Sequence, residues 1–323
     1  MKKSVLPALV AAAVVIGAPA IAADLAPVYK AAPPPVAYNP WDVAVGGGLM
    51  TDYNFRGISQ SDRTAAVTAY FEGRFNPTKD IQWYAGAVGT SVKLATDPAA
   101  EIDLYGGVRM TWDKWTLDLG AMYYLYPGER QVDGVWITAP PAGNTTLTQT
   151  DFWEIYGKLT WAPTDNWTFG VAGYYADSWL NTGADGTYGA LTLKYTGTAL
   201  PSGWNWYVSG ELGHYWLGTT DLLFTTTNVV VYSDLTGTTG AELPSYTTWN
   251  AGIGFTYKAL TLDLRYYDTD LSEAECNILT GDPSAALTAP VFVNNTATVG
   301  ASNWCGQAFI GKLTFDTTLS AIK

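Results

Sequence analysis

Few residues of this chain have side chains suited to catalysis or metal binding. It has one histidine, His214, and two cysteines, Cys276 and Cys305. A hydrolase triad needs a base close to a nucleophile, yet no serine stands at position 215 or 216. Zinc sites need clusters of histidine and cysteine ligands, which the composition does not supply. We therefore expect no enzyme, no resident metal and no cofactor.

The charged residues instead occupy alternate positions of long segments. In the segment 101–112, apolar residues such as Leu104 and Met110 alternate with polar ones such as Asp103 and Arg109. A period of two places the two sets on opposite faces of a β-strand. Soluble strands have about five or six residues, whereas about nine to eleven are needed to cross a bilayer. The pattern predicts membrane-spanning strands with one apolar and one charged face.

The same alternation recurs along the whole chain, in segments separated by connections of two kinds. The predicted strands are 41–55, 64–75, 81–94, 101–112, 115–126, 151–161, 167–177, 187–196, 203–216, 246–258, 260–269 and 304–316. Short connections alternate with longer ones, as the two ends of outer-membrane barrels require. The sequence therefore predicts an all-β fold, a transmembrane antiparallel up-and-down β-barrel of about 12 strands.

The composition supports a lipid-facing barrel. Charged residues make up only 14% of the chain and aromatic residues another 14%, where soluble domains have about 25% charged residues. The net charge of −12 argues against binding nucleic acid. Tryptophans gather near the short connections, where indole rings favour the bilayer interface: Trp41, Trp83, Trp112, Trp115, Trp161, Trp167, Trp204 and Trp206. A second aromatic belt is predicted at Tyr53, Phe55, Tyr123, Trp179, Trp216 and Tyr246.

The first forty residues differ from the rest. Lys2 and Lys3 precede an apolar run and a stretch of small residues ending at Ala23, the layout of a secretory signal peptide. We assign 1–22 to this signal peptide, 23–40 to a periplasmic tether rich in Pro and Ala, and 41–323 to the barrel. In an exported protein the two cysteines, Cys276 and Cys305, are expected to form a disulfide.

The charged face of the strands would line the barrel interior. It comprises Asp42, Asp52, Glu72, Arg74, Glu101, Asp103, Arg109, Asp118, Glu154, Lys158, Lys194, Glu211, Asp263, Arg265 and Lys312. Two interpretations remain open. An acidic lining would favour cations in a narrow aqueous pore. Alternatively, Arg74, Arg109 and Arg265 pair with Glu72, Asp103 and Asp263 and fill the barrel with ion pairs.

One contiguous motif follows the tether and the first strand, Thr51-Asp52-Tyr53-Asn54-Phe55-Arg56-Gly57-Ile58-Ser59-Gln60-Ser61-Asp62. It resembles the N-terminal motif of the TorF-type porins, a proteobacterial outer-membrane family. The motif residues are Asp52, Tyr53, Phe55, Arg56, Gly57, Ser59 and Gln60. The resemblance implies an outer-membrane barrel with pore activity. From the residues themselves we expect Gly57 to provide a positive φ in the first outer turn, and Arg56 to pair with Asp52 or Asp62.

Together these features predict a channel in the bacterial outer membrane. Small polar or cationic solutes would diffuse passively through its narrow acidic lumen, and its other partners would be membrane lipid and the barrel-assembly machinery. The sequence leaves open the solute and the oligomeric state. The alternative is a non-conducting structural or surface-display barrel whose loops 127–150, 217–245 and 270–303 bind ligands or envelope components.

Overall fold

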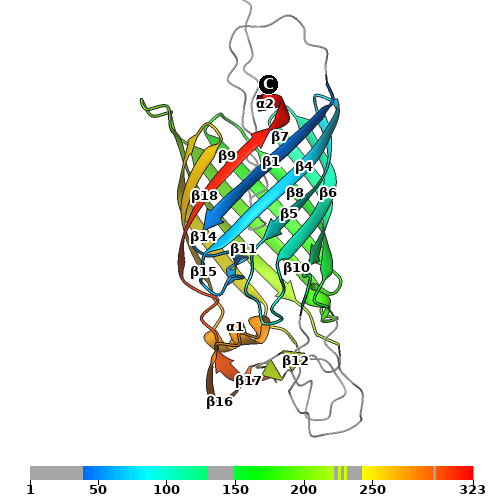
Figure 1. Cartoon of the computed structure of the whole chain (residues 1–323), viewed down its shortest axis with the longest axis vertical. Helices are drawn as coiled ribbons and strands as arrows, with labels where there is room; N and C mark the ends of the chain where they lie inside the picture. The colour runs from blue at the N-terminus through cyan, green and yellow to red at the C-terminus, as the bar shows by residue number, and fades with distance from the viewer. Residues whose placement is uncertain are drawn as a thin grey trace, which may run out of the picture.

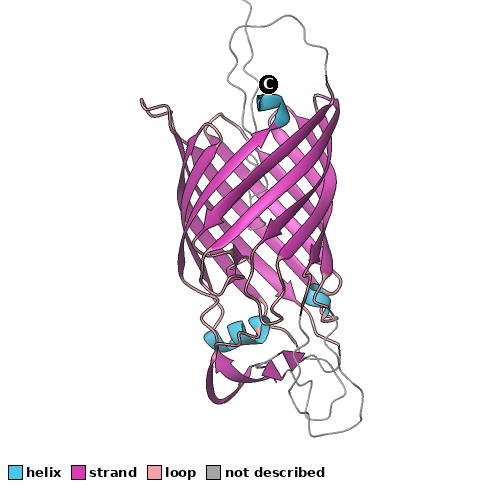
Figure 2. Ribbon diagram, viewed as in Figure 1, coloured by secondary structure: helices cyan, strands magenta, loops and turns pink. Residues whose placement is uncertain are grey.

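The computed structural model is a closed barrel of twelve antiparallel strands, drawn in Figures 1 and 2. It describes residues 39–129, 149–221, 225–226, 229–230, 242–293 and 296–322. The barrel strands are β1 (Trp41–Met50), β4 (Ala66–Thr78), β5 (Ile81–Thr90), β6 (Glu101–Trp112), β7 (Trp115–Leu125), β8 (Phe152–Trp161), β9 (Trp167–Ala176), β10 (Gly186–Thr196), β11 (Asn205–Leu217), β14 (Tyr246–Tyr257), β15 (Leu260–Thr269) and β18 (Ala308–Thr318). Neighbours in the chain are neighbours in the ring, and β1 closes it by pairing with both β4 and β18. The predicted all-β up-and-down barrel is confirmed.

The strand bounds follow the sequence alternation except near the start. The predicted strand 41–55 is too long, because β1 ends at Met50 and the chain then turns into the barrel. Its continuation forms a small separate hairpin of β2 (Asn54–Phe55) and β3 (Ile58–Ser59). The predicted strand 81–94 also ends early, at Thr90. The predicted signal peptide and nearly all of the tether lie outside the described residues.

The two ends of the barrel differ in their connections. At one end, here called the short-turn end, strands are joined by tight turns such as Asp113-Lys114, and the short helix α2 (Leu319–Ile322) lies there (Figure 1). The opposite, long-loop end carries η1 (Trp179–Asn181), α1 (Glu273–Thr280) and a small sheet (Figure 2). That sheet consists of β12 (Thr225–Thr226), β13 (Val229–Val230), β16 (Ala286–Val293) and β17 (Thr296–Ala301). Neither α1 nor this sheet was predicted.

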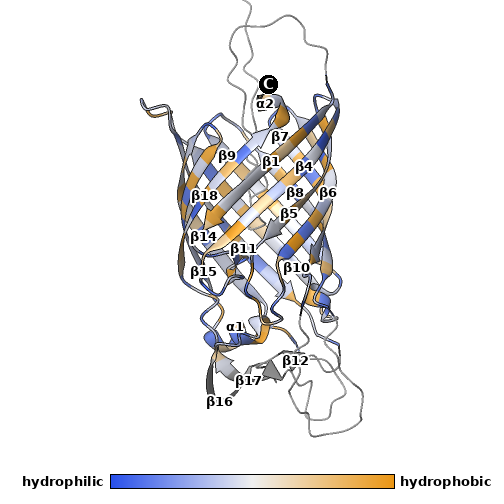
Figure 3. Cartoon of the chain, viewed as in Figure 1, coloured by the Kyte–Doolittle hydropathy of each residue, from blue (hydrophilic) through white to orange (hydrophobic). Residues whose placement is uncertain are grey.

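Hydrophobic and hydrophilic residues alternate along the barrel strands (Figure 3), and many large apolar side chains are exposed on the outer face. Leu49, Phe71, Val171 and Leu191 each expose more than half of their surface. A closed ring of strands leaves no unpaired barrel edge, so such a face is stable in hydrocarbon. Within the described residues, no helix has the length and apolarity to cross a membrane.

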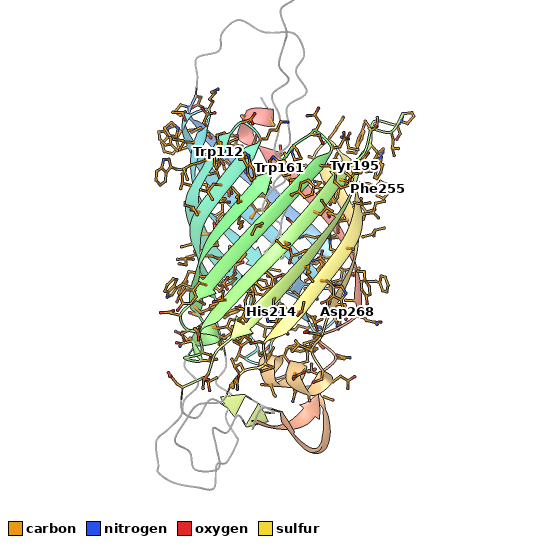
Figure 4. The ribbon with its side chains drawn as sticks, turned by 180° about the vertical axis from the view of Figure 1, so that it is seen from behind. Trp112, Trp161, Tyr195, His214, Phe255 and Asp268 are labelled. Atoms are coloured by element: carbon orange, nitrogen blue, oxygen red, sulfur yellow. A yellow bond between two sulfur atoms is a disulfide. The ribbon has the colours of Figure 1, made fainter. Side chains whose placement is uncertain are left out.

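Aromatic rings mark the short-turn end. Trp112 and Trp161 project from this end in Figure 4, far from His214 and Asp268 at the opposite end. Trp41, Trp83 and Trp167 are also exposed there, as the predicted girdle requires. The predicted second belt is wrong for Tyr53, Phe55, Trp179 and Tyr246, which pack inside the long-loop end; only Tyr123 and Trp216 of that set are exposed.

The predicted disulfide is present and ties an outer helix to the barrel. Cys276 lies in α1, and Cys305 lies just before β18, with 5.8 Å between their Cα atoms. The helix begins with a capping box, in which Ser272 and Glu275 satisfy each other's backbone amides. The disulfide therefore holds a capped helix over the long-loop end of the barrel.

Candidate functional site

The motif after β1 folds into the barrel as a hairpin, which we call the inner hairpin (residues 52–61). Its turn is Arg56-Gly57, whose φ angles of 48° and 88° are both positive, as a type I′ turn requires. The amide of Gly57 donates to Oδ1 of Asn54 at 3.0 Å. A Cβ at Gly57 would lie 2.2 Å from the Thr269 methyl group on β15. Only glycine therefore fits here, and the predicted positive φ at Gly57 is confirmed.

The inner hairpin carries Arg56 across the lumen to the opposite wall. The hairpin follows β1, and β9 lies six strands from β1 in either direction round the ring. The guanidinium of Arg56 donates two hydrogen bonds to the Glu154 carboxylate on β8, with N···O distances of 2.7 and 2.8 Å. The expected pairing of Arg56 with Asp52 or Asp62 is wrong, because the hairpin points inward and the turn lies close to β8.

Aromatic rings enclose this guanidinium. Tyr174 of β9, Tyr188 of β10 and Tyr215 of β11 place their ring centroids 4.7, 4.5 and 4.8 Å from Cζ of Arg56. Phe55 of the hairpin adds a fourth ring at 4.6 Å. We call these four residues and Glu154 the arginine cage. Each ring attracts the cation through its negative face, more strongly where water is excluded.

Glu154 is held in place by wall residues as well. Tyr124 of β7 donates to its Oε2 at 2.9 Å, and Tyr215 donates to its Oε1 at 3.4 Å. The side chains of Arg56 and Glu154 are 3% and 1% exposed. A buried pair of this kind is stable only when further hydrogen bonds satisfy the carboxylate, and removing one partner is strongly unfavourable.

The base of the inner hairpin is fixed to the same wall. Asp52 accepts hydrogen bonds from Ser59 and Ser61 at 2.6 and 2.9 Å. The Tyr53 hydroxyl donates to Glu101 at 2.5 Å, and Tyr126 donates to the other oxygen of Glu101 at 2.9 Å. Burial, reinforced by the charge of Glu101, raises the pKa of both phenols well above the ordinary tyrosine value. Both therefore remain protonated donors.

Contacts with the outer segment before β18 hold the hairpin from the other side. The Ser59 amide donates to the Trp304 carbonyl at 2.8 Å, and the Trp304 indole donates to Asp62 at 3.0 Å. Arg63 donates to the carbonyls of Asn303, Cys305 and Gln307. The disulfide-bonded segment is thus attached to the hairpin, and Arg63, not Arg56, is the arginine near Asp52, with an N···O distance of 3.9 Å.

An apolar cavity of about 110 Å³ separates the inner hairpin from the outer helices. Its lining includes Phe55 and Ile58 of the hairpin, Trp179 of η1, Leu279 of α1 and Trp304. Apolar constrictions disfavour a continuous water column. Within the described residues, the inner hairpin and the apolar side chains packed against it occupy the long-loop end of the lumen.

Ion pairs along the wall characterise the short-turn half of the lumen. Glu72 of β4 accepts from Arg74 at 2.6 Å and from both terminal nitrogens of Arg109 at 2.9 Å. Arg109 also contacts Asp118 of β7 at 3.4 Å, and its guanidinium lies 3.8 Å from the ring centroid of Tyr84. The prediction that Arg109 pairs with Asp103 is therefore wrong, because Arg109 pairs with Glu72 and Asp118.

A second group of ion pairs lies on the opposite side of this half. Arg265 and Asp263 of β15 pair at 3.0 Å, as one interpretation of the sequence anticipated. Arg265 also donates to Asn250 of β14 and Ser209 of β11, both at 2.7 Å. The side chains of Arg265 and Asp263 are 14% and 17% exposed, so water reaches them more readily than it reaches Arg56.

The strand residues predicted to line the lumen all lie in inward phase on their strands, but few are free of a partner group. Lys158 and Lys194 lie over the rings of Tyr156 and Tyr207, at 4.4 and 4.2 Å. Asp103 is 1% exposed, and within the described chain its Oδ1 has no hydrogen-bond partner. Asp52 belongs to the inner hairpin and not to the wall. The role of the predicted wall residues in a solute passage remains a prediction.

The remaining predicted wall residues have these places. Asp42 lies at the short-turn rim and bonds Ser320, Glu211 accepts from Tyr188 at 2.6 Å, and Lys312 lies on β18 opposite Asp263. His214 faces outward beside Trp216, as its phase predicted. Among the described residues, no cluster of three acids, histidines or cysteines is placed to hold a metal ion.

Residues 35–297 match a family described as bacterial proteins of unknown function, Gcw_chp. The chain belongs to the Gcw_chp family. The match supports neither the TorF resemblance in particular nor any activity. No curated protein matches the sequence significantly.

Solved outer-membrane structures resemble this Gcw_chp protein only remotely. The NanC porin is 10% identical, with a TM-score of 0.40 over 85% of this chain and 98% of the porin. An outer-membrane channel from Pseudomonas putida is also 10% identical, with a TM-score of 0.39 over 90% of this chain and all of the channel. LpxR from Salmonella typhimurium is 9% identical, with a TM-score of 0.38 over 84% and 99%. Similarities this remote do not indicate the function of this protein.

Sequence reasoning missed the tyrosines of the Gcw_chp barrel interior. Tyr156, Tyr174, Tyr188 and Tyr215 are buried among charged groups, and none of the four was assigned to the interior from the sequence. Their phase was the available signal, since each occupies the same strand face as the charged residues. Glu154, for example, has the same phase on β8 as Tyr156.

Proposed function

We propose that this protein is a channel for small polar solutes in the bacterial outer membrane, closed in the described conformation by its inner hairpin. The Arg56–Glu154 pair is the observation that carries the proposal, because it joins the hairpin to the far wall across the lumen. Arginine lies at the centre of the motif that resembles the TorF-type porins. If that resemblance reflects common function, the motif is the closing element of such a pore.

Several features support this location. The outer face is apolar, and short turns alternate with long loops, as they do in outer-membrane barrels with the turns on the periplasmic side. A predicted signal peptide precedes the barrel. The partners are then membrane lipid, the barrel-assembly machinery and the passing solutes, and Phe315 on β18 is the aromatic residue that the assembly machinery would read.

The charges inside the barrel favour polar or cationic solutes over anions. Glu101, Asp103, Glu154 and Glu211 lie towards the long-loop end, and of these acids Glu154 is the one that pairs with Arg56. Acidic rings in a pore raise the local concentration of cations. Withdrawal of the hairpin would therefore expose a net acidic passage.

Planar-bilayer recording tests the proposal directly. The variant replaces residues 52–61 with a short Gly-Ser linker, which removes Arg56 without interrupting any barrel strand. We expect the full chain to be closed for most of the recording and the variant to conduct steadily with cation preference. Glu273→Gln, on the exposed start of α1 at the same end, is the control. A folded variant that carries no current across a range of salts would reject the channel.

A non-conducting structural barrel is the second candidate, and one contact favours it. Tyr84 of β5 and Tyr156 of β8 meet at 2.6 Å through their hydroxyls and so fill part of the short-turn half without the hairpin. The variants Asp103→Asn and Asp263→Asn, made in the hairpin-replaced barrel, separate the two candidates. In a pore, these substitutions shift the reversal potential. A filled barrel carries no current, and the substitutions lower the temperature at which it unfolds.

A further inference from the structure

The walls of the arginine cage belong to the barrel. Glu154, Tyr174, Tyr188 and Tyr215 come from the consecutive strands β8, β9, β10 and β11. Only Phe55 arrives with the inner hairpin. The carboxylate and three of the four rings would therefore remain in the wall after the hairpin had left the lumen.

These wall residues are positioned independently of Arg56. Tyr124 and Tyr215 hold the two oxygens of Glu154. Tyr188 donates to Glu211 at 2.6 Å, which fixes the plane of its ring. The rings of Tyr188 and Tyr215 also pack edge to face, with centroids 5.6 Å apart. A preorganised site of this kind loses little conformational freedom on binding a ligand.

The chemistry of the cage selects a flat organic cation. A carboxylate that accepts two parallel N–H bonds matches the fork of a guanidinium, and aromatic faces attract the same delocalised, weakly hydrated cation. A compact ammonium ion supplies the charge but not the planar fork. To enter the cage, a sodium ion would have to lose its hydration water and exchange it for contacts with the aromatic rings.

The backbone of the hairpin adopts an unfavourable conformation at Arg56, the residue whose guanidinium lies in the cage. Arg56 has φ 48°, a left-handed conformation that type I′ turns usually give to asparagine or glycine. Other residues adopt this conformation only at an energetic cost. The side chain of Arg56 offsets this through the cage, so the hairpin acts as a covalently attached guanidinium ligand.

We propose that the arginine cage is a recognition site for guanidinium-bearing organic cations and that Arg56 is its built-in occupant. The inference rests on the proposed function, since a solute reaches the cage through the lumen when the hairpin withdraws. A buried carboxylate without a cation is unfavourable. A guanidinium-bearing solute therefore replaces Arg56 in the open state and binds at this point of the passage.

Chemical rescue of the full-length variant Arg56→Ala tests the site. Ethylguanidinium chloride at millimolar concentration should raise the midpoint of its thermal unfolding saturably. Ethylammonium should need a roughly tenfold higher concentration, because it lacks the second parallel hydrogen bond. The double variant Arg56→Ala with Glu154→Gln should show no saturable response. Arg63→Ala, which removes an arginine of the same loop outside the cage, should respond no more than it does to sodium chloride.

If Arg56→Ala does not fold, refolding is the readout: recovery with ethylguanidinium and not with ethylammonium supports the site, and no recovery overturns it. In the folded variant, equal responses to both cations or persistence in the double variant also overturn it. Conductance separates this inference from the channel. Rescue without current in any variant rejects the channel and retains the site, whereas current without saturable rescue retains the channel and rejects the site.

Discussion

The two halves of the lumen neutralise their charges in different ways. In the long-loop half, Glu154 depends on a guanidinium brought in by a hairpin, and the pair is 3% and 1% exposed. In the short-turn half, arginines such as Arg265 lie on the wall beside their acids and remain partly accessible. In the proposed channel, the Arg56–Glu154 pair would close the lumen only while the hairpin is inside it, whereas the wall pairs would stay the same with the hairpin in or out. On that proposal, the charge carried by the hairpin, and not the wall, determines closure.

The largest contrast is expected between Glu154→Gln and Asp263→Asn. Glu154→Gln leaves Arg56 buried without its partner charge and should lower the free energy of unfolding by about 3–5 kcal/mol. Asp263→Asn removes a partly hydrated pair and should cost about 1–2 kcal/mol. Unfolding in urea, followed by tryptophan fluorescence, measures both; guanidinium salts are avoided because they compete for the cage. Equal losses would break the distinction between the halves.

The second effect concerns the attachment of the hairpin to the outer segment. Cys276→Ser with Cys305→Ser releases a loop closed over a sequence separation of 29, which in the chain-entropy model lowers stability by about 3.6 kcal/mol. Since Arg63 and Trp304 join the hairpin to this segment, we also expect more frequent openings in bilayer recordings. Reduced stability with unchanged opening would show that the cage alone holds the hairpin.

The smallest effect is expected at the hairpin turn. Gly57→Ala forces an alanine to φ 88° and into the Thr269 methyl group, which should cost about 1–2 kcal/mol. Gly203→Ala is the matched control: its φ is 84°, and a Cβ there would meet the Tyr257 ring at an ordinary contact distance of 3.7 Å, without a clash. Thermal midpoints compare the two. If only Gly57→Ala increases the channel's open fraction, the closure is sensitive to the fit of the turn.

The barrel could be predicted from the sequence because lipid imposes a simple rule on each strand. Leu104 and Leu191 had to face hydrocarbon, and Asp103 and Lys194 therefore had to face inward, which fixes both strand and phase. The partners inside the lumen depend on contacts across the ring. Arg56 meets Glu154 across 98 residues of sequence, and alternation carries no information about such pairs. The positive φ at Gly57 was predicted, but the placement of the Arg56-Gly57 turn on the outside was wrong, because nothing in its pattern gave the direction in which the hairpin points.

The seam between β1 and β18 has a consequence for biogenesis. The inner hairpin lies between the first two strands of the ring, and the ring is closed by its first and last strands. A growing sheet can therefore curl around the hairpin as successive strands are added, with no need to thread it into a finished cylinder. If the strands are added in chain order, β8 to β11 meet Arg56 before β1 pairs with β18, and the barrel would close with its hairpin already inside.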